Sequence, residues 1–286
     1  MSTILECNKC LINSSVDVIT EIKGAHLCQE CLKFEFNHLD SLSLNEQWSK
    51  YIANIKKKAK GKYDVLFALS GGKDSIAALY FTVKKYNLKP LAFTVNHGFK
   101  NEVILKNCLN ITKKLDVDWI LTNVSKEITD EIRAISNSGE LPCTRCGKLW
   151  KNDYYKQVVE LTGIDTVFTG GDTLVDGYFE FSKPEWSVDN VGLPLAVNFL
   201  TEKEIYDLAY SLGWKNPNVT GWDTDCTAVG VALKNYRDKH GIYHEEELKH
   251  LAHRVRHGLL DKETARKMLL EEMKVSSEIL KQFNGN

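Results

Sequence analysis

Three groups of residues in this chain have types and spacings that are typical of chemical sites. The first is Ser70-Gly71-Gly72-Lys73-Asp74-Ser75, which we call the glycine loop and whose main-chain N–H groups could bind an anion. The second is a pair of Cys-x-x-Cys motifs near the N-terminus, typical of a metal site. The third is a central Cys-x-x-Cys pair with one later cysteine, which could serve redox, sulfur or cluster chemistry.

The glycine loop stands between an expected strand and an expected helix. Residues 63–69 form an apolar run of strand length, and the apolar residues after Ser75 continue with helical spacing. In this context the N–H groups of the turn point outward, the helix dipole adds partial positive charge, and the glycines allow phosphates to approach closely. The loop is not a Walker A loop, because the G-x-x-x-x-G-K-[ST] spacing is absent.

The N-terminal motifs predict a small zinc ribbon over residues 1–40. Cys7-x-x-Cys10 and Cys28-x-x-Cys31 are separated by seventeen residues, a spacing that suits four thiolates in a tetrahedron with short strands between them. Such a closed site would contribute folding energy and no catalysis. An iron–sulfur centre or a redox dithiol pair is the alternative.

Cys143, Cys146 and Cys226 are one cysteine short of a closed four-thiolate site. They suit a [4Fe–4S] cluster with one iron left open for an exogenous ligand such as sulfide. They equally suit a persulfide carrier and its resolving partner, because a cysteine at a helix N-terminus has a lowered pKa. Cys226 taken alone could be an ordinary buried cysteine, and we expect Cys108 to be a core residue.

Strands and helices alternate in the middle of the chain. The expected strands are 63–69, 90–95, 118–123 and 165–169, and the expected helices are 74–86, 101–115, 126–137 and 147–162. This alternation predicts an α/β domain with a doubly wound parallel sheet over 63–226. We expect a linking helix over 41–62 before it and a helical region over 227–286 after it. Ligands in this architecture lie beyond the carboxyl ends of the strands, at the switch point.

The composition limits the classes of function that this chain could have. The net charge is −1, with 43% hydrophobic and 26% charged residues, which is ordinary for a globular protein and lacks the basic excess of a dedicated nucleic-acid binder. The lysine-rich stretch 56–62 could form a local basic patch, or simply a solvated helix end. There is no apolar run of about 18 residues and no signal-like N-terminus, so we expect a cytoplasmic protein without a membrane segment.

The glycine loop, between its strand and its helix, resembles the pyrophosphate loop (PP-loop) of the ATP pyrophosphatase superfamily. Members bind ATP on this loop, adenylate a substrate oxygen and release pyrophosphate. The resemblance implies an adenine nucleotide alpha hydrolase-like fold. It also implies a site in which the six loop residues hold the phosphates with Mg²⁺ and Asp74 is catalytic. His97, after the second strand, would help to recognise adenosine; a catalytic role for it is the alternative.

The cysteines narrow the resemblance to the tRNA 2-thiolation enzymes. Those enzymes combine a PP-loop, N-terminal double knuckles, a central Pro-Cys-x-x-Cys-Gly and one later cysteine, and here Pro142 and Gly147 complete the central motif. In that family the three cysteines hold a [4Fe–4S] cluster beside the ATP site. The resemblance therefore implies that Cys143, Cys146 and Cys226 are iron ligands.

Two features depart from the thiolation family. Its members usually end in a second cysteine-rich ribbon that helps to hold tRNA, whereas this chain has no cysteine after position 226. Many sulfur-inserting relatives also carry Gly-His-x-x-Asp-Asp after the fourth strand. This chain keeps only Gly170 and the acids Asp172 and Asp176 there. Contacts from Gly170 and Asp172 to the nucleotide or magnesium are expected on that weaker match.

The C-terminal third is similar to another PP-loop family, the N-acetyl sugar amidotransferases. The match is the run Arg-x-Gly-x-x-x-x-Glu-x-Ala from Arg256 to Ala265, together with the N-terminal knuckles. In that family ammonia from a partner glutaminase attacks an adenylated sugar carbonyl. The run could equally be a plain helical hairpin packed on the sheet, in which Gly258 ends one helix and Asp261 caps the next.

These observations lead us to expect an AMP- and pyrophosphate-forming sulfurtransferase that replaces a carbonyl-type oxygen with sulfur. Its cofactors would be ATP, Mg²⁺, Zn²⁺ and a [4Fe–4S] cluster. Its sulfur donor would be sulfide or a persulfide carrier, and its acceptor a tRNA, a small molecule or a sugar. An amidotransferase and a nucleotide-sensing or cluster-carrying binding protein are the alternatives. The sequence leaves the oligomeric state open, including a homodimer.

Overall fold

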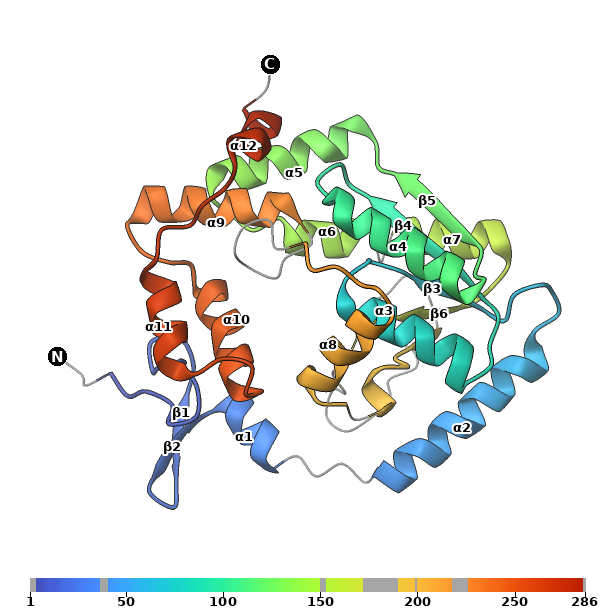
Figure 1. Cartoon of the computed structure of the whole chain (residues 1–286), viewed down its shortest axis with the longest axis horizontal. Helices are drawn as coiled ribbons and strands as arrows, with labels where there is room; N and C mark the ends of the chain where they lie inside the picture. Colours follow the sequence, from blue (N-terminus) through green and yellow to red (C-terminus); the bar gives the residue numbers. More distant parts are fainter. Residues whose placement is uncertain are drawn as a thin grey trace.

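A parallel sheet of five strands in the order β5-β4-β3-β6-β7 lies in the right half of the molecule in Figure 1. The computed structural model describes residues 4–36, 41–149, 153–171, 190–198, 200–217 and 226–284. The strands are β3 (Val65–Ala68), β4 (Pro90–Asn96), β5 (Trp119–Asn123), β6 (Thr166–Thr169) and β7 (Asn190–Gly192). The chain winds outward from β3 to β5 and then returns to the other side of β3. The switch point is therefore at β3, the strand that leads into the glycine loop.

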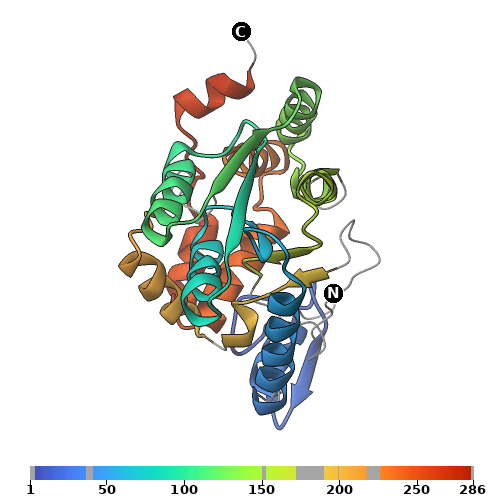
Figure 2. The same ribbon diagram turned by 90° about the vertical axis from the view of Figure 1, so that its right-hand side faces the viewer.

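Strands β3, β4 and β6 are buried on both faces, as their apolar runs predict, whereas Ile120 and Leu121 of the edge strand β5 are exposed. Along β3, Val65 and Phe67 belong to one apolar core and Leu66 belongs to another, because successive side chains point to opposite faces. Helices accordingly lie on both sides of the sheet in the view of Figure 2. The expected fold class, a doubly wound parallel α/β domain, is confirmed.

Four helices supply the first core and one supplies the second. The first contains residues from α2 (Ser41–Lys58), α3 (Lys73–Tyr80), α4 (Glu102–Leu115) and α8 (Glu202–Ser211). The second contains residues from α7 (Tyr155–Thr162). A short 3₁₀ turn, Ala196–Asn198, precedes α8. Asn101 caps α4 by accepting a hydrogen bond from Val103 N–H, and Thr201 and Glu204 form a capping box on α8.

The N-terminal module is a hairpin followed by a helix: β1 (Ile19–Ile22), β2 (Ala25–Cys28) and α1 (Gln29–Phe36). Lys23 and Gly24 form its two-residue turn, both with positive φ (52° and 80°), which is the conformation that a tight hairpin between twisted strands requires.

The C-terminal region contains α9 (Thr227–His240), α10 (Glu245–Arg256), α11 (Lys262–Leu270) and α12 (Ser277–Phe283). Helix α9 packs along α5 (Lys126–Ser138), and Gly139 approaches it so closely that a Cβ there would lie 3.0 Å from Tyr236 N. Asp261 caps α11, as the sequence predicted.

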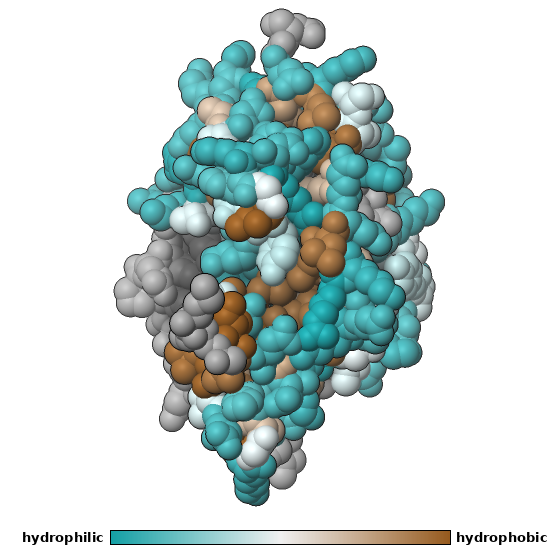
Figure 3. Space-filling model, turned by 90° about the vertical axis from the view of Figure 1, so that its left-hand side faces the viewer, coloured by the Kyte–Doolittle hydropathy of each residue, from teal (hydrophilic) through white to brown (hydrophobic). Residues whose placement is uncertain are grey.

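The two ends of the chain share one apolar core. It unites the four N-terminal cysteines and Leu27 with residues of α10 and α11, including Leu251 and Ala265. Figure 1 accordingly shows the N-terminal hairpin beside α10 and α11. Ion pairing adds to this packing, because Arg266 of α11 binds Glu6. Figure 3 shows this side of the molecule, mainly hydrophilic with apolar atoms gathered near its middle.

Some expected elements differ from the observed ones. Within the helix predicted over 147–162 the structure describes α6 (Cys143–Leu149) and α7, and residues 150–152 between them lie outside the described residues. Helix α6 also begins earlier than predicted, because Cys146 N–H bonds to Pro142 O at 2.9 Å and closes a turn around the cysteine pair. The helix predicted over 74–86 changes after Tyr80 into a π-helical turn, Phe81–Lys85. Neither β7 nor α8 was expected.

Within the ranges that the structure describes, no helix combines the length and the apolar character needed to cross a membrane.

A close approach between β6 and α3 generates a stability prediction. A Cβ on Gly170 would lie 2.6 Å from both N and Cα of Ser75, and neither backbone atom can move without displacing α3. We expect Gly170→Ala to lower the free energy of unfolding by about 1–3 kcal/mol, measured by urea denaturation. The control is Gly61→Ala, since nothing lies within 4 Å of that position. Equal stability of the two variants would contradict the observed packing.

Candidate functional site

The glycine loop begins directly after β3 and enters α3 at Lys73. Gly71 has φ +90°, and a Cβ there would lie 2.6 Å from Ile104 O, so the position requires glycine. The hydroxyl of Ser75 accepts hydrogen bonds from Gly71 N–H (3.1 Å) and Ser70 Oγ (3.0 Å) and donates to Gly72 O (2.9 Å). One serine thus fixes the whole turn at the N-terminus of α3, where the helix dipole favours an anion.

Two distant residues support the loop from behind. The Gly71 carbonyl accepts hydrogen bonds from the Trp214 indole N–H (3.1 Å) and from Asn107 Nδ2 (3.4 Å). Asn107 Nδ2 also donates to Lys215 O at 2.8 Å, which joins α4 to the segment after α8. Sequence reasoning missed Trp214 and Asn107, and no local motif marks either residue.

Lys73 is the most enclosed charge of the loop. Its Nζ lies 2.7 Å from Asp74 Oδ1 and 2.8 Å from Glu202 Oε1, and 5.0 Å above the Tyr206 ring. Burial opposes the charge on Lys73, yet the carboxylates of Asp74 and Glu202 raise its pKa above the ordinary value. Lys73 is therefore a cation at neutral pH, and it is the first residue of α3.

Glu202 is the buried counter-charge that the sequence analysis did not anticipate. Burial by itself would raise its pKa, but the interactions with His253 of α10 and with Lys73 lower it to about 2. His253 Nε2 lies 3.9 Å from Glu202 Oε2. The capping motif Thr201–Glu204 could have revealed the start of α8, but nothing in the local sequence places that helix against the glycine loop.

The later cysteines lie near the loop. Cys146 and Cys226 belong to one apolar cluster with Phe99, although 80 positions separate them. Lys100 joins this cluster to the loop: its backbone bridges to Cys226, and its Nζ donates to Ser70 O at 3.4 Å. Cys146 and Cys226 therefore lie in one cluster that Lys100 connects to the glycine loop.

Cys143 and Cys146 differ in exposure although they share α6. Cys143 is exposed and Cys146 is buried. Burial raises the pKa of the Cys146 thiol to about 11 and the nearby Cys143 adds to the shift, whereas the Lys100 ammonium opposes it. All eight cysteines lie in described residues, and none is in a disulfide. Cys108 is fully buried, as expected for a core residue.

The other predicted site residues have different surroundings. His97 is buried, and its Nδ1 accepts a hydrogen bond from Phe99 N–H at 3.2 Å, so it shapes the turn that leads to Lys100. Gly170 lies against the backbone of Ser75. Asp172 and Asp176 lie outside the described residues.

The lysine-rich stretch 56–62 lies away from this site. Lys58, Lys60 and Lys62 line a pocket of about 430 Å³ together with Asp64 and Thr166, near the amino ends of β3 and β6. The glycine loop lies at the opposite, carboxyl edge of the same sheet, so these lysines cannot contact a ligand bound there.

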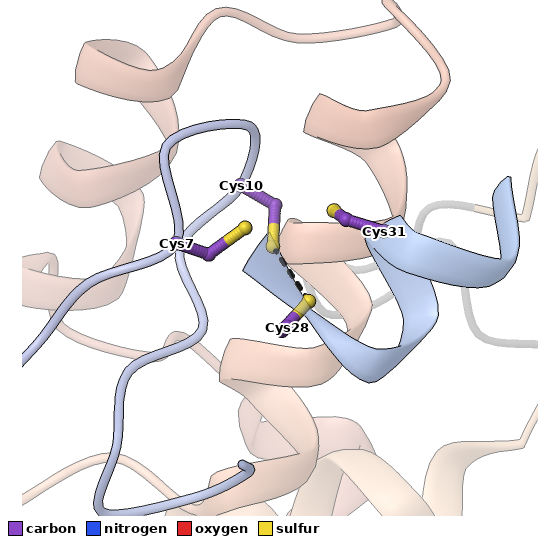
Figure 4. A group of neighbouring side chains, drawn as sticks. All are labelled: Cys7, Cys10, Cys28 and Cys31. Carbon is purple, nitrogen blue, oxygen red and sulfur yellow. Dashed lines mark hydrogen bonds between the residues drawn. The ribbon is translucent and has the colours of Figure 1, made fainter. Parts of the chain in front are cut away.

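The four N-terminal cysteines form the second candidate site. Their sulfur atoms all lie within 4.8 Å of one another, with Cys10 Sγ and Cys28 Sγ 3.6 Å apart, and Figure 4 shows the four side chains converging. The hydrogen bond with Cys10 lowers the pKa of Cys28. In a tetrahedral thiolate site with bonds of about 2.3 Å, neighbouring sulfurs are about 3.8 Å apart, so the group could hold one metal ion.

Among the residues that the structure describes, this is the only set of three or more potential ligands with such short mutual distances. Cys143, Cys146 and Cys226 do not form one, so their geometry is not that of a single tetrahedral ion.

Two C-terminal side chains close over the four-cysteine site. Arg256 Nε, at the end of α10, donates to Cys31 Sγ at 3.3 Å. Lys262 Nζ, at the start of α11, donates to Cys7 O at 2.7 Å. A metal held by four thiolates carries excess negative charge, which these two cations would offset.

The convergence of the four thiols generates a metal-release prediction. We expect Cys28→Ser to release one metal ion per chain, measured by elemental analysis, and to lower the thermal midpoint, because the ion can no longer be enclosed by four thiolates. Cys108→Ser is the matched control: it also alters a fully buried cysteine, but should keep the metal. Metal loss in the control alone would refute the assignment.

Comparisons with known proteins place the chain among relatives. No protein-family model matches it. The uncharacterized protein MJ1599 of Methanocaldococcus jannaschii is 32% identical over 279 residues, which covers 98% of each chain.

Three solved structures are similar to this chain at TM-scores below 0.5. The NH3-dependent NAD synthetase of Campylobacter jejuni has a TM-score of 0.40 at 20% identity, covering 86% of this chain and 93% of that one. The U34-tRNA thiolase NcsA of Methanococcus maripaludis, solved with its [4Fe-4S] cluster, has a TM-score of 0.43 at 14% identity over 96% and 91% of the two chains. NMN synthetase of Francisella tularensis has a TM-score of 0.43 at 14% identity over 86% and 92%. Because 32% identity extends over nearly all of both sequences, the chain belongs to the protein family of MJ1599.

Proposed function

We propose that this protein is an ATP-dependent sulfurtransferase of the PP-loop type, which adenylates a carbonyl-type oxygen, releases pyrophosphate and replaces the oxygen with sulfur. The observation that carries the proposal is the position of Lys100, whose side chain donates to the glycine loop while its backbone pairs with Cys226. An anion-binding loop and a cysteine cluster thereby adjoin at the carboxyl edge of one sheet, where α/β proteins bind ligands.

In the adenylation step the glycine loop holds the phosphates. The N-terminus of α3 binds phosphate oxygens, while Ser70 and Ser75 keep the turn in shape by accepting hydrogen bonds from Gly72 N–H and Gly71 N–H. Lys73 offsets the charge that develops on the departing pyrophosphate. Asp74, which is paired with Lys73, is the loop carboxylate that would bind Mg²⁺, and the ion would neutralise phosphate charge when bound. The substrate oxygen attacks the α-phosphorus, the bond to pyrophosphate breaks, and an acyl-type adenylate remains.

In the second step sulfur displaces AMP from the activated carbon. Cys143, Cys146 and Cys226 would hold a [4Fe–4S] cluster through three thiolates, and the cluster would supply a binding position for sulfide. Burial of Cys146 and partial burial of Cys226 keep water away from that side of the site. The cluster-free route would use a persulfide that exposed Cys143 receives from a persulfide carrier. Its outer sulfur would bond to the activated carbon as AMP leaves, and a second cysteine thiolate would then release the sulfur-containing product by forming a disulfide with Cys143, which an added thiol reductant would reduce. At the N-terminal module we propose Zn²⁺ in a structural role.

One contact favours a second candidate, an amidotransferase acting on an N-acetyl sugar with ammonia. Arg256 opens the C-terminal run that resembles those enzymes, and its side chain bonds to Cys31 of the N-terminal knuckles. Both features of that resemblance therefore lie together in space.

The adenylation step can be tested on the loop. We expect Asp74→Asn to fold normally but to reduce pyrophosphate release by about 10²-fold on addition of unmodified tRNA or an N-acetyl sugar, because the phosphates and their metal lose a charged partner. Asp238→Asn, which alters an exposed acid on α9, is the control and should be unaffected. Wild-type turnover in the loop variant would mean that the catalytic ATP site lies elsewhere. A wild-type protein that binds ATP but never releases pyrophosphate would indicate a sensor.

The choice between sulfur and nitrogen rests on the three cysteines. Anaerobically purified protein should hold about four irons, with a broad absorbance that added sulfide perturbs and that Cys226→Ala abolishes. Cys108→Ala, a buried cysteine outside the cluster, should retain the iron. Full activity of iron-free protein with ammonia would reject the sulfurtransferase and establish the amidotransferase.

A further inference from the structure

Helix α10 contacts both candidate sites. Near its end, Arg256 donates to Cys31 Sγ of the four-cysteine site at 3.3 Å. One turn earlier, His253 Nε2 lies 3.9 Å from Glu202 Oε2, beside the glycine loop. Residues three apart on a helix occupy neighbouring surface positions, so this one turn of α10 reaches the two sites at once. Figure 1 shows α10 between α8 and the N-terminal module.

Glu202 connects this turn of α10 to Lys73 of the glycine loop. Its side chain is 6% exposed and its Oε1 lies 2.8 Å from Lys73 Nζ. Lys73 is itself only 15% exposed, so the position of its ammonium is determined by Glu202 and by Asp74 beside it. Asp74 is adjacent in sequence and moves with the loop, whereas Glu202 belongs to α8. Glu202 is therefore the partner through which the rest of the protein can act on Lys73.

The part of α10 that packs beside the four-cysteine site is rigid as well. Leu248, Leu251 and Ala252 of α10 are at most 3% exposed, and they belong to the same apolar core as the four cysteines. Close-packed interiors transmit displacements because they contain little free volume. A change in the four-cysteine site therefore shifts α10, and with it His253.

We propose that Glu202 and His253 are positioning residues for Lys73, and that through α10 they couple metal binding at the four-cysteine site to phosphate binding at the glycine loop. This inference rests on the proposed function for the two ligands, ATP and the metal ion, but not on the choice between sulfur and nitrogen. A bound ion holds Cys31 in place, Arg256 holds the end of α10 against it, and His253 keeps Glu202 oriented toward Lys73. Without the ion Cys31 is no longer held in place, and the contacts from Arg256 to Lys73 that depend on it weaken.

The test is a thermodynamic cycle on the full-length protein. The dissociation constant of the α,β-methylene analogue of ATP, with Mg²⁺, is measured by calorimetry in metal-loaded and metal-free protein, and the ratio of the two values is the coupling. Typical coupling between two sites is about 5- to 150-fold, so we expect metal removal to weaken analogue binding at least about fivefold. Coupling is reciprocal, so the analogue should tighten zinc binding by the same factor in a chelator competition.

Variants locate the coupling. Glu202→Gln keeps the size of the side chain but removes its charge, and Arg256→Gln removes the contact to Cys31; in both, the ratio should fall to near one. Arg266→Gln is the matched control, because it cuts another link between the module and the C-terminal helices, the ion pair with Glu6, without touching α10. It should keep the wild-type ratio. A variant that is only less stable should bind the analogue more weakly both with and without the metal. The ratio of its two dissociation constants therefore stays as in the wild type.

The outcomes separate the two proposals. A ratio near one in wild-type protein that binds both ligands would overturn the coupling and leave the proposed function standing. An unchanged ratio in Glu202→Gln would overturn the role of Glu202. Failure of the analogue to bind the metal-loaded wild type would overturn the ATP site itself. If circular dichroism shows that the metal-free protein is unfolded, its dissociation constant for the analogue does not report on the coupling. The chelator competition on metal-loaded protein, with and without the analogue, then decides the question.

Discussion

The buried ammonium of Lys73 is the group on which the arrangement of this protein depends. A charge removed from water is tolerated only when opposite charges lie close to it, and here Asp74 and Glu202 lie within 2.8 Å. Asp74 can meet this need locally, but Glu202 can do so only if α8 packs beside α3. The ion pair therefore specifies how the segment after β7 returns to the sheet, and Trp214, at the end of that segment, then supports Gly71.

The same requirement extends outward through α10 to the ends of the chain. Glu202 is itself buried and needs a second partner, which His253 provides. Helix α10 in turn packs on the four-cysteine module, which is too small to bury an apolar core alone. The N-terminal ribbon and the C-terminal helices therefore form one packed unit. Through His253 and Glu202 this unit contacts Lys73 of the glycine loop. A metal ion bound at the ribbon would therefore also stabilise the C-terminal helices that pack on it.

The cysteine cluster adjoins the loop by a different route. The turn after β4, shaped by buried His97, presents Lys100 between Ser70 and Cys226. The Phe99 carbonyl accepts hydrogen bonds from both the N–H and the hydroxyl of Thr227, which holds the start of α9 at this edge of the sheet. A nucleotide on the loop and a nucleophile at the cysteines would therefore meet across Lys100. This arrangement suits either donor element, since sulfide and ammonia both attack an adenylated carbon.

Sequence alone determined the features of this protein that depend on local chemistry. The alternation of apolar strands and helices, the glycine loop after the first strand, and the two knuckles all follow from spacing and backbone geometry within short segments. The fold class and the convergence of the four thiols could be predicted for that reason. The approach of Cys226 to Cys146 could be anticipated too, because parallel strands bring their following loops to one edge.

Only the tertiary structure decided which distant residues complete the sites. Glu202, His253 and Trp214 carry no motif, and the run that contains Arg256 does not place it beside Cys31, because these roles come from the packing of helices whose relative positions no local pattern encodes. The start of α6 at Cys143 was likewise missed, since it depends on a hydrogen bond to the Pro142 carbonyl and not on apolar periodicity. Local propensity determines which segments are helices and strands. The burial of charge and apolar surface determines which of them meet.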